Sequence, residues 1–140
     1  MTAVLVDSNV LLDILTEDKT WSDWSGDALA IAADNARLVI NAVVYAEVSV
    51  RFSRIEDLED ALPASFVSRE AIPFEAAFLA AKAFVRYRRR GGARASPLPD
   101  FFIGAHAAVA NYSVLTRDPS RYRTYFPSIP LIAPRIGKRA

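Results

Sequence analysis

The sequence contains no cysteine, and this absence excludes disulfide bonds, thiolate metal ligands and cysteine nucleophiles. Long apolar runs are also missing, so no segment has the length needed to span a bilayer. The apolar N-terminus is interrupted early by Asp7 and has no basic segment before it, which argues against a secretory signal. We therefore expect a cytoplasmic protein without a membrane partner.

The chain has almost no net charge, because 17 lysines and arginines offset 16 acids to leave +1. Its charges are nevertheless segregated. Residues 1–35 contain seven acids and one lysine, whereas residues 76–99 contain six basic residues and no acid. An acidic pocket beside a basic rim is the arrangement that a metal-dependent enzyme needs to act on a polyanion.

A hydrophobic content of 52% over 140 residues is sufficient for a single domain, and no linker or repeat divides residues 1–140. Apolar runs predict strands at residues 3–6, 37–40 and 113–116, with weaker candidates at 68–72 and 131–133. Helical patterns predict helices at 10–15, 21–33, 42–52 (capped by Asn41), 54–62, 75–90 and 100–111. The helix at 75–90 is expected to be amphipathic, with an apolar face made of Phe74, Phe78, Ala81 and Val85. Alternating strands and helices favour an α/β fold whose parallel sheet is covered on both faces.

Four acidic residues lie where these elements begin or end. Asp7 and Asp118 follow strands, whereas Glu47 and Asp100 lie on helices that can cross the same edge of the sheet. Sites in parallel sheets form beyond the C-terminal ends of the strands, so we expect the four carboxylates to converge. Carboxylates brought together repel one another unless a cation neutralises them, and Mg²⁺ or Mn²⁺ suits such oxygen ligands.

Each acid also has an ordinary structural alternative. Asp7, Asp100 and Asp118 each stand where a carboxylate can cap a helix or turn. Glu47 lies on the expected buried face of its helix, where it can instead pair with Arg51 one turn later. These separate roles predict acids scattered around the fold, whereas their positions at strand ends predict convergence, which is the hypothesis we adopt.

Three polar side chains accompany the acids. Thr116 precedes Asp118 by two residues, so both point to the same side of an extended strand, and Asn9 stands in the same relation to Asp7. Each side chain can support a bound water or a carboxylate. Alternatively, Thr116 is an ordinary strand threonine and Asn9 is a helix cap. His106 lies within an alanine-rich helix, six residues after Asp100, so the two side chains do not share a helical face. This position favours a core histidine over a catalytic one.

A run of arginines ends the helix predicted at 75–90. Positive charge there suits both a solvated helix end and the helix dipole. A glycine-containing loop beside Asp100 also allows contact with phosphate groups, and the two interpretations are compatible. The candidate phosphate ligands are Arg86, Arg89, Arg90 and Arg94.

Four stretches carry these residues in the order and at the separations of a known family. Their sequences are VLVDSNV at 4–10, NAVVYAE at 41–47, PDFFIGAHA at 99–107 and LTRDPSRY at 115–122. Together they resemble PIN-domain nucleases, and most closely the VapC toxins of bacterial toxin–antitoxin pairs. No acid of the family pattern is missing.

The resemblance implies a three-layer α/β/α sandwich with a central parallel sheet, and Mg²⁺- or Mn²⁺-dependent endoribonuclease activity. The acids of the family correspond to Asp7, Glu47, Asp100 and Asp118, with Thr116 as the supporting hydroxyl. It further implies a homodimer, a VapB-type antitoxin that inserts a C-terminal segment into the active-site groove, and a structured RNA substrate such as tRNA or a ribosomal RNA loop.

The expected reaction is metal-assisted hydrolysis of an RNA phosphodiester. We expect Asp7, Asp100 and Asp118 to hold one or two ions directly or through water, and Glu47 to hold a bound water or complete the site. Two other functions stay open. An aspartyl phosphatase also begins with a strand that ends in Asp, but its usual second acid is replaced here by Asn9. A PIN module without catalytic activity could bind RNA or protein, although the complete acidic set favours an enzyme.

Overall fold

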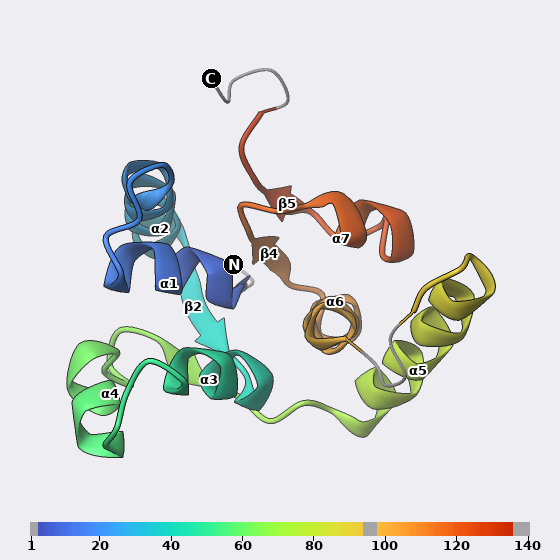
Figure 1. The fold of residues 1–140 in the computed structure, drawn as a ribbon, viewed down its shortest axis with the longest axis horizontal. Coiled ribbons are helices and arrows are strands. Elements are labelled where there is room, and N and C mark those ends of the chain that lie inside the picture. The colour runs from blue at the N-terminus through green and yellow to red at the C-terminus, as the bar shows by residue number, and fades with distance from the viewer. Residues whose placement is uncertain (1–2, 94–97, 136–140) are drawn as a thin grey trace.

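The computed structural model describes residues 3–93 and 98–135. These residues form a five-stranded sheet flanked by helices (Figure 1). The strands are β1 (Ala3–Val6), β2 (Arg37–Ile40), β3 (Ser68–Arg69), β4 (Ser113–Leu115) and β5 (Leu131–Ile132). The helices are α1 (Ser8–Leu15), α2 (Ser22–Asn35), α3 (Ala42–Ser49), α4 (Ile55–Ala61), α5 (Phe74–Arg89), α6 (Pro99–Ala110) and α7 (Ser120–Tyr125).

The sheet has the strand order β3-β2-β1-β4-β5, and every neighbouring pair is parallel. The first strand is therefore central, with β2 on one side and β4 on the other. The register pairs Leu5 with Val39 and with Val114. The chain leaves β1 toward one side of the sheet and later returns to the other side, so a crevice is expected at the carboxyl ends of β1 and β4.

The three inner strands are buried on both faces because helices cover both sides of the sheet. All four residues of β1 are buried, and Leu5 and Val6 have no exposed surface. Near-continuous apolar runs are typical of parallel strands that lie between two helical layers. The predicted α/β fold with a central parallel sheet is therefore confirmed.

Two sets of helices pack beside the sheet. In the first, α1 contacts both α2 and α3; in the second, α6 contacts both α5 and α7. The helices α4 and α5 lie at opposite ends of the long axis (Figure 1). The close approach of α6 to the end of α7 depends on Gly104, because a Cβ there would lie 2.5 Å from the Phe126 ring.

The predicted apolar face of α5 is wrong, although the helix itself is confirmed. Phe74 and Phe78 are 91% and 66% exposed, whereas the buried residues are Ala76, Ala80 and Ala83. Small residues at this spacing allow the backbones of α5 and α6 to approach closely, so the alanines rather than the phenylalanines meet the core.

Two further elements differ from the prediction. The strand expected at 68–72 ends after Arg69, because its partner β2 ends at Ile40 and the last ladder bond is Glu70 N to Ile40 O at 2.9 Å. The sequence patterns do not predict α7 as an element. Among the described residues, no helix is both long and apolar enough to cross a bilayer.

Candidate active site

Asp7 lies directly after β1 and is 3% exposed. Its backbone N–H donates to Leu115 O at 2.9 Å, which extends the pairing of β1 with β4 beyond the strand. Its side-chain oxygen Oδ2 accepts hydrogen bonds from Tyr122 Oη at 2.8 Å, Thr116 Oγ1 at 3.0 Å and Asn9 Nδ2 at 3.4 Å. Within the described part of the chain, Oδ1 accepts no side-chain hydrogen bond, so this oxygen retains the capacity to bind a ligand.

Burial raises the pKa of the Asp7 carboxyl, and the hydrogen bonds from Tyr122 and Thr116 partly oppose that effect. Asp7 also precedes α1 as its N-cap residue but makes no side-chain capping bond. The carboxylate is instead bonded to Thr116 and to Tyr122 of α7, and the backbone N–H groups of Ser8 and Asn9 further lower its pKa.

Thr116 and Asn9 hold together the loops that follow β1 and β4. Besides donating to Asp7, Thr116 Oγ1 accepts from Asn9 Nδ2 at 3.2 Å and from the backbone N–H of Asp118 at 3.1 Å. Asn9 Oδ1 in turn accepts from the backbone N–H of Arg117 at 3.3 Å. Both side chains therefore fix the positions of the two aspartates rather than serving as isolated polar residues.

Glu47 comes to the same region from α3. It is half-buried, and its Oε1 accepts from Ser8 Oγ at 2.7 Å. Burial raises the pKa of the Glu47 carboxyl, the Ser8 hydroxyl lowers it and the negative charge of Asp7 raises it again. No ion pair joins Glu47 to Arg51 among the described residues, so the helix-surface alternative is wrong.

Asp100 lies in the first turn of α6, after Pro99 at the first helical position. The N-cap residue is Leu98, so Asp100 does not cap the helix. Burial, together with the charges of Asp7, Glu47 and Asp118, raises the pKa of Asp100 to about 6. The guanidinium of Arg121, 3.5 Å from Asp100 Oδ2, acts in the opposite direction. The four acids therefore share one electrostatic environment.

Asp118 is the exposed member of the set. The helix α7 begins at Ser120 with Pro119 as its N-cap, so Asp118 is not the capping residue. Its neighbour Arg117 donates from Nε to Asp13 Oδ2 at 2.8 Å, and Asp13 is only 3% exposed. This ion pair ties the loop that carries Asp118 to α1.

The arginines at the end of α5 lie beside α7. Arg86 and Arg90 place their guanidinium groups 5.3 and 5.8 Å from the centre of the Tyr125 ring. Both are exposed, as is Arg89, and Arg94 lies outside the described residues. Because α7 also carries Arg121 toward Asp100, positive charge lies on this side of the site.

His106 is a buried residue of α6 with two partners. Its Nδ1 lies 3.2 Å from Asn41 Nδ2, and its Nε2 lies 3.3 Å from Glu70 Oε1. Asn41 also caps α3, as predicted, because its Oδ1 accepts from the backbone N–H groups of Val43 and Val44. His106 thus links the helix that carries Asp100 to the start of the helix that carries Glu47, which is the role of a core histidine.

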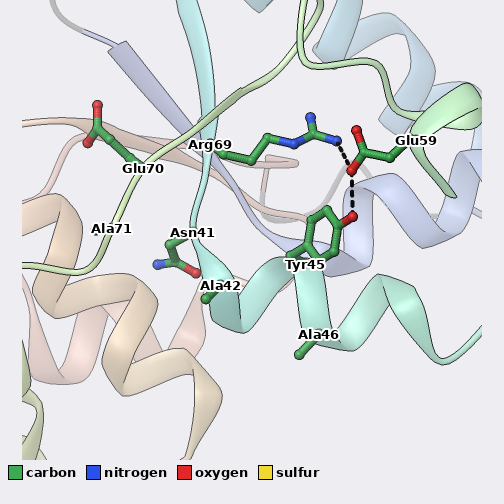
Figure 2. A pocket seen from close by; sticks show the side chains of 8 residues that line it. All are labelled: Asn41, Ala42, Tyr45, Ala46, Glu59, Arg69, Glu70 and Ala71. Atoms are coloured by element: carbon green, nitrogen blue, oxygen red, sulfur yellow. Dashed lines mark hydrogen bonds and ion pairs between the residues drawn. The ribbon is translucent and has the colours of Figure 1, made fainter. Parts of the chain in front are cut away.

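A cavity of about 490 Å³ lies at the carboxyl ends of β2 and β3, but its lining includes none of the four acids (Figure 2). Figure 2 shows Glu59 between Tyr45 and Arg69, and this carboxylate accepts hydrogen bonds from both. Since these charged groups pair with one another, this cavity is not the candidate active site.

The donor set decides whether a divalent ion fits this site. In residues 3–93 and 98–135, no group of three or more His, Cys, Asp or Glu side chains is arranged to hold an ion alone. A hydrated ion does not need such a group, since Mg²⁺ keeps several of its waters and needs only one or two carboxylates. The mutual repulsion that acts on Asp100 also favours a cation here.

Tyr122 and Ser8 are the site residues that sequence reasoning missed. Tyr122 has no exposed surface, and it lies 115 residues along the chain from Asp7, to which its hydroxyl donates. A tyrosine placed shortly after a candidate acid is a weak signal, because a buried tyrosine can find a partner anywhere in the core. Ser8 is adjacent to Asp7, but its bond to Glu47 requires the packing of α1 on α3.

Comparisons with known proteins agree with this architecture. The chain matches the PIN domain family model over residues 4–127. Its fold is similar to that of a chain of Rickettsia felis VapBC2 bound to a promoter DNA fragment, with TM-score 0.71, 17% identity and coverage of 96% of this chain and 100% of that one. VapBC-1 from nontypeable Haemophilus influenzae gives a TM-score of 0.70 and 16% identity, with coverage of 95% of this chain and 98% of that one. A toxin–antitoxin complex from Klebsiella pneumoniae gives a TM-score of 0.67 and 20% identity, with coverage of 95% of this chain and 98% of that one.

A search of curated proteins found no match. The structural similarities concern the fold, because all three identities are low. The family model, however, covers most of the chain, including all four acids. The chain therefore belongs to the PIN-domain family.

Proposed function

We propose that this protein is a Mg²⁺- or Mn²⁺-dependent endoribonuclease and the toxin of a toxin–antitoxin pair, built as a single nuclease domain over residues 1–140. One observation carries the proposal: Asp7, Glu47 and Asp118 all act electrostatically on Asp100, at the carboxyl edge of a parallel sheet. PIN domains are generally nucleases, which supports the reaction class.

The carboxylates have different environments and therefore different tasks. Asp7 is held at Oδ2 by three neutral donors, so its orientation is fixed while Oδ1 can accept a ligand. Glu47 is held at one oxygen by Ser8, which leaves Oε2 to accept a proton of a water positioned for in-line attack on phosphorus. In the reaction, water adds to the phosphorus and a ribose oxygen leaves.

Asp7, Asp100 and Asp118 would hold the divalent ion directly or through its waters. Thr116 and Asn9 hold Asp7 in position, and Thr116 also holds the backbone of Asp118. The chemistry that such an ion would supply is a lowered pKa of a coordinated water and neutralisation of charge on the phosphoryl oxygens.

The arginines near α7 would bind the substrate strand. Arg86 and Arg90 stack beside Tyr125 of α7, the helix whose Arg121 meets Asp100. Together with the exposed Arg89, they would contact phosphates that flank the cleaved one, and Arg94 is a further candidate.

The partners follow from the same proposal. Similar folds occur in VapBC and other toxin–antitoxin complexes, which supports a VapB-type antitoxin for this chain. We also propose a homodimer, a structured RNA substrate such as tRNA or ribosomal RNA, and a cytoplasmic location.

The direct test uses the antitoxin-free protein with total cellular RNA and Mg²⁺ or Mn²⁺, followed by sequencing of the 5′ ends that are produced. We expect discrete cuts that disappear with EDTA and with Asp7→Asn. Asp60→Asn is the matched control, because Asp60 is an exposed acid of α4 outside the site.

The outcomes separate the possible functions. Cuts by the parent and by Asp60→Asn, but not by Asp7→Asn, support the proposal and identify the RNA. A folded parent that cuts nothing with either ion, yet binds RNA, would point instead to a PIN module without catalytic activity. Cleavage at the parent rate by Asp7→Asn would remove the assigned site.

A further inference from the structure

A second cavity, of about 280 Å³, adjoins the candidate active site. We call it the Asp118 cavity, because that acid forms part of its wall. The remaining lining comes from the residue before α2, from the loop between β4 and α7, from α7 itself and from the segment after β5. It includes Trp21, Arg117, Ser120, Arg123 and Arg135.

Three guanidinium groups and one carboxylate line the Asp118 cavity. Arg123 and Arg135 are exposed, and neither forms an ion pair with any described residue. The cavity therefore carries an excess of positive charge. A multivalent anion is the ligand class that such a lining favours.

The third arginine is fixed in place before any ligand binds. Arg117 Nε is bonded to Asp13, whose Oδ2 also accepts from Ser25 Oγ at 2.7 Å, and the guanidinium lies 5.5 Å from the centre of the Trp21 ring. Its two terminal amino groups make no hydrogen bond within the described residues. They are donors held in a defined direction, which suits a phosphate oxygen.

The position of α7 places arginines on two sides of the acids. Arg121 and Arg123 are two residues apart, so they project from nearly opposite sides of the helix. Arg121 meets Asp100, whereas Arg123 lines the Asp118 cavity. A nucleic-acid strand that has one phosphate at the carboxylates must place neighbouring phosphates close by, and Asp118 borders both places.

We propose that the Asp118 cavity binds a backbone phosphate of the RNA strand, next to the phosphate that is cleaved. This inference rests on the proposed nuclease function. The cavity volume is slightly below that of sites which enclose a whole small molecule, so it suits a phosphate with its ribose rather than a folded segment.

The test compares Arg123→Gln/Arg135→Gln with Arg51→Gln/Arg54→Gln, a control that removes the same charge from exposed arginines outside the cavity. Binding of a fluorescein-labelled single-stranded RNA dodecamer of mixed sequence is measured by anisotropy in EDTA at several KCl concentrations. We expect about tenfold weaker binding at 100 mM KCl for the cavity variant. The slope of log K against log[salt] should fall in magnitude by about 0.7 for each phosphate that the variant no longer neutralises.

Cleavage kinetics provide the second measurement, on the RNA that the 5′-end sequencing identifies. An interaction made equally to substrate and transition state affects KM alone, so its removal should raise KM while kcat stays near the parent value. The control variant should match the parent in both measurements. Circular dichroism checks that both double variants are folded.

The outcomes distinguish the two proposals. If the parent cleaves RNA and the cavity variant has the parent's affinity, salt slope and KM, the cavity inference is wrong and the nuclease stands. If the parent binds RNA through these arginines but cleaves nothing, the nuclease proposal is wrong, and of the cavity inference only the binding of a backbone phosphate stands. The same anisotropy titration is made with a fluorescein-labelled acidic dodecapeptide. If the cavity variant loses affinity for this peptide but not for RNA, the occupant is a protein segment and the RNA inference is overturned.

Discussion

The metal-free protein should become more stable when Asp100 is replaced by asparagine. Burial and the charges of Asp7, Glu47 and Asp118 raise the pKa of the Asp100 carboxyl from 3.8 to about 6. A raised pKa in the folded state means that this group favours folding below pH 4, and that this contribution disappears as the pH rises through 6. Asparagine has nearly the same shape and carries no charge, so it removes the repulsion at neutral pH.

The magnitude follows from the difference between the two pKa values. Without solvent screening, that difference corresponds to a change of roughly 3 kcal/mol in the free energy of unfolding. The Asp100 side chain is 34% exposed, so solvent screening reduces the expected gain to on the order of 1–2 kcal/mol. For a domain of this length, such a gain raises the melting temperature by about 3–8 °C.

The assay is thermal unfolding in EDTA between pH 4 and pH 8, for the parent, Asp100→Asn and the control Asp60→Asn. The difference between Asp100→Asn and the parent should be near zero at pH 4, grow through pH 6 and level off above pH 7. Adding Mg²⁺ at pH 7.5 should stabilise the parent more than the variant, because the ion binds the folded acidic site.

Two results would refute this reasoning. If Asp100→Asn melts at or below the parent temperature at pH 7.5 in EDTA, the carboxylates do not repel one another in the folded protein. If the difference is the same at pH 4 and pH 8, it arises from packing and not from charge.

Two further predictions concern residues that support the acids. Tyr122→Phe removes the 2.8 Å hydrogen bond to Asp7 and should therefore raise the pKa of Asp7 further. The acid limb of the pH–rate profile of RNA cleavage should then move to higher pH, and kcat should fall about tenfold. An unchanged profile would contradict this role of Tyr122. Arg117→Gln leaves the buried Asp13 without its cation and should lower the free energy of unfolding in urea by about 2–3 kcal/mol. Arg54→Gln should lower it by under about 0.5 kcal/mol, because the ion pair of Arg54 is mostly exposed. Equal losses for the two variants would contradict this reasoning.

Much of the fold could be predicted because local signals agreed with the tertiary structure. The strands β1 and β2 have the predicted bounds and are apolar throughout except for Arg37, and Asn41 caps α3 as its side-chain chemistry indicates. The face of α5 could not be predicted from hydrophobicity alone, since Phe74 is more apolar than the buried Ala76 but does not fit the narrow space beside α6.

The candidate site was predictable to a different degree. The strand-end positions of Asp7 and Asp118 indicated where the acids gather, because parallel strands end at one edge. Their hydrogen-bond partners were less accessible to sequence reasoning. Tyr122 reaches Asp7 only when α7 packs on α6, and Ser8 reaches Glu47 only through the packing of α1 on α3. Such contacts depend on side-chain directions between distant segments, and no local pattern encodes them.

The unequal support of the acids indicates which of them depends most on a cation. Three neutral donors hold Asp7 and one holds Glu47, and these bonds stabilise both carboxylates whether or not an ion is bound. Among residues 3–93 and 98–135, the side-chain partner of the Asp100 carboxylate is the guanidinium of Arg121 at 3.5 Å, on a side chain that is itself 38% exposed. A neutral residue at position 100 would satisfy the fold better than a carboxylate with a raised pKa. An acid at this position therefore does not serve the stability of the ligand-free protein, whereas the proposed divalent ion would stabilise its charge in the folded state.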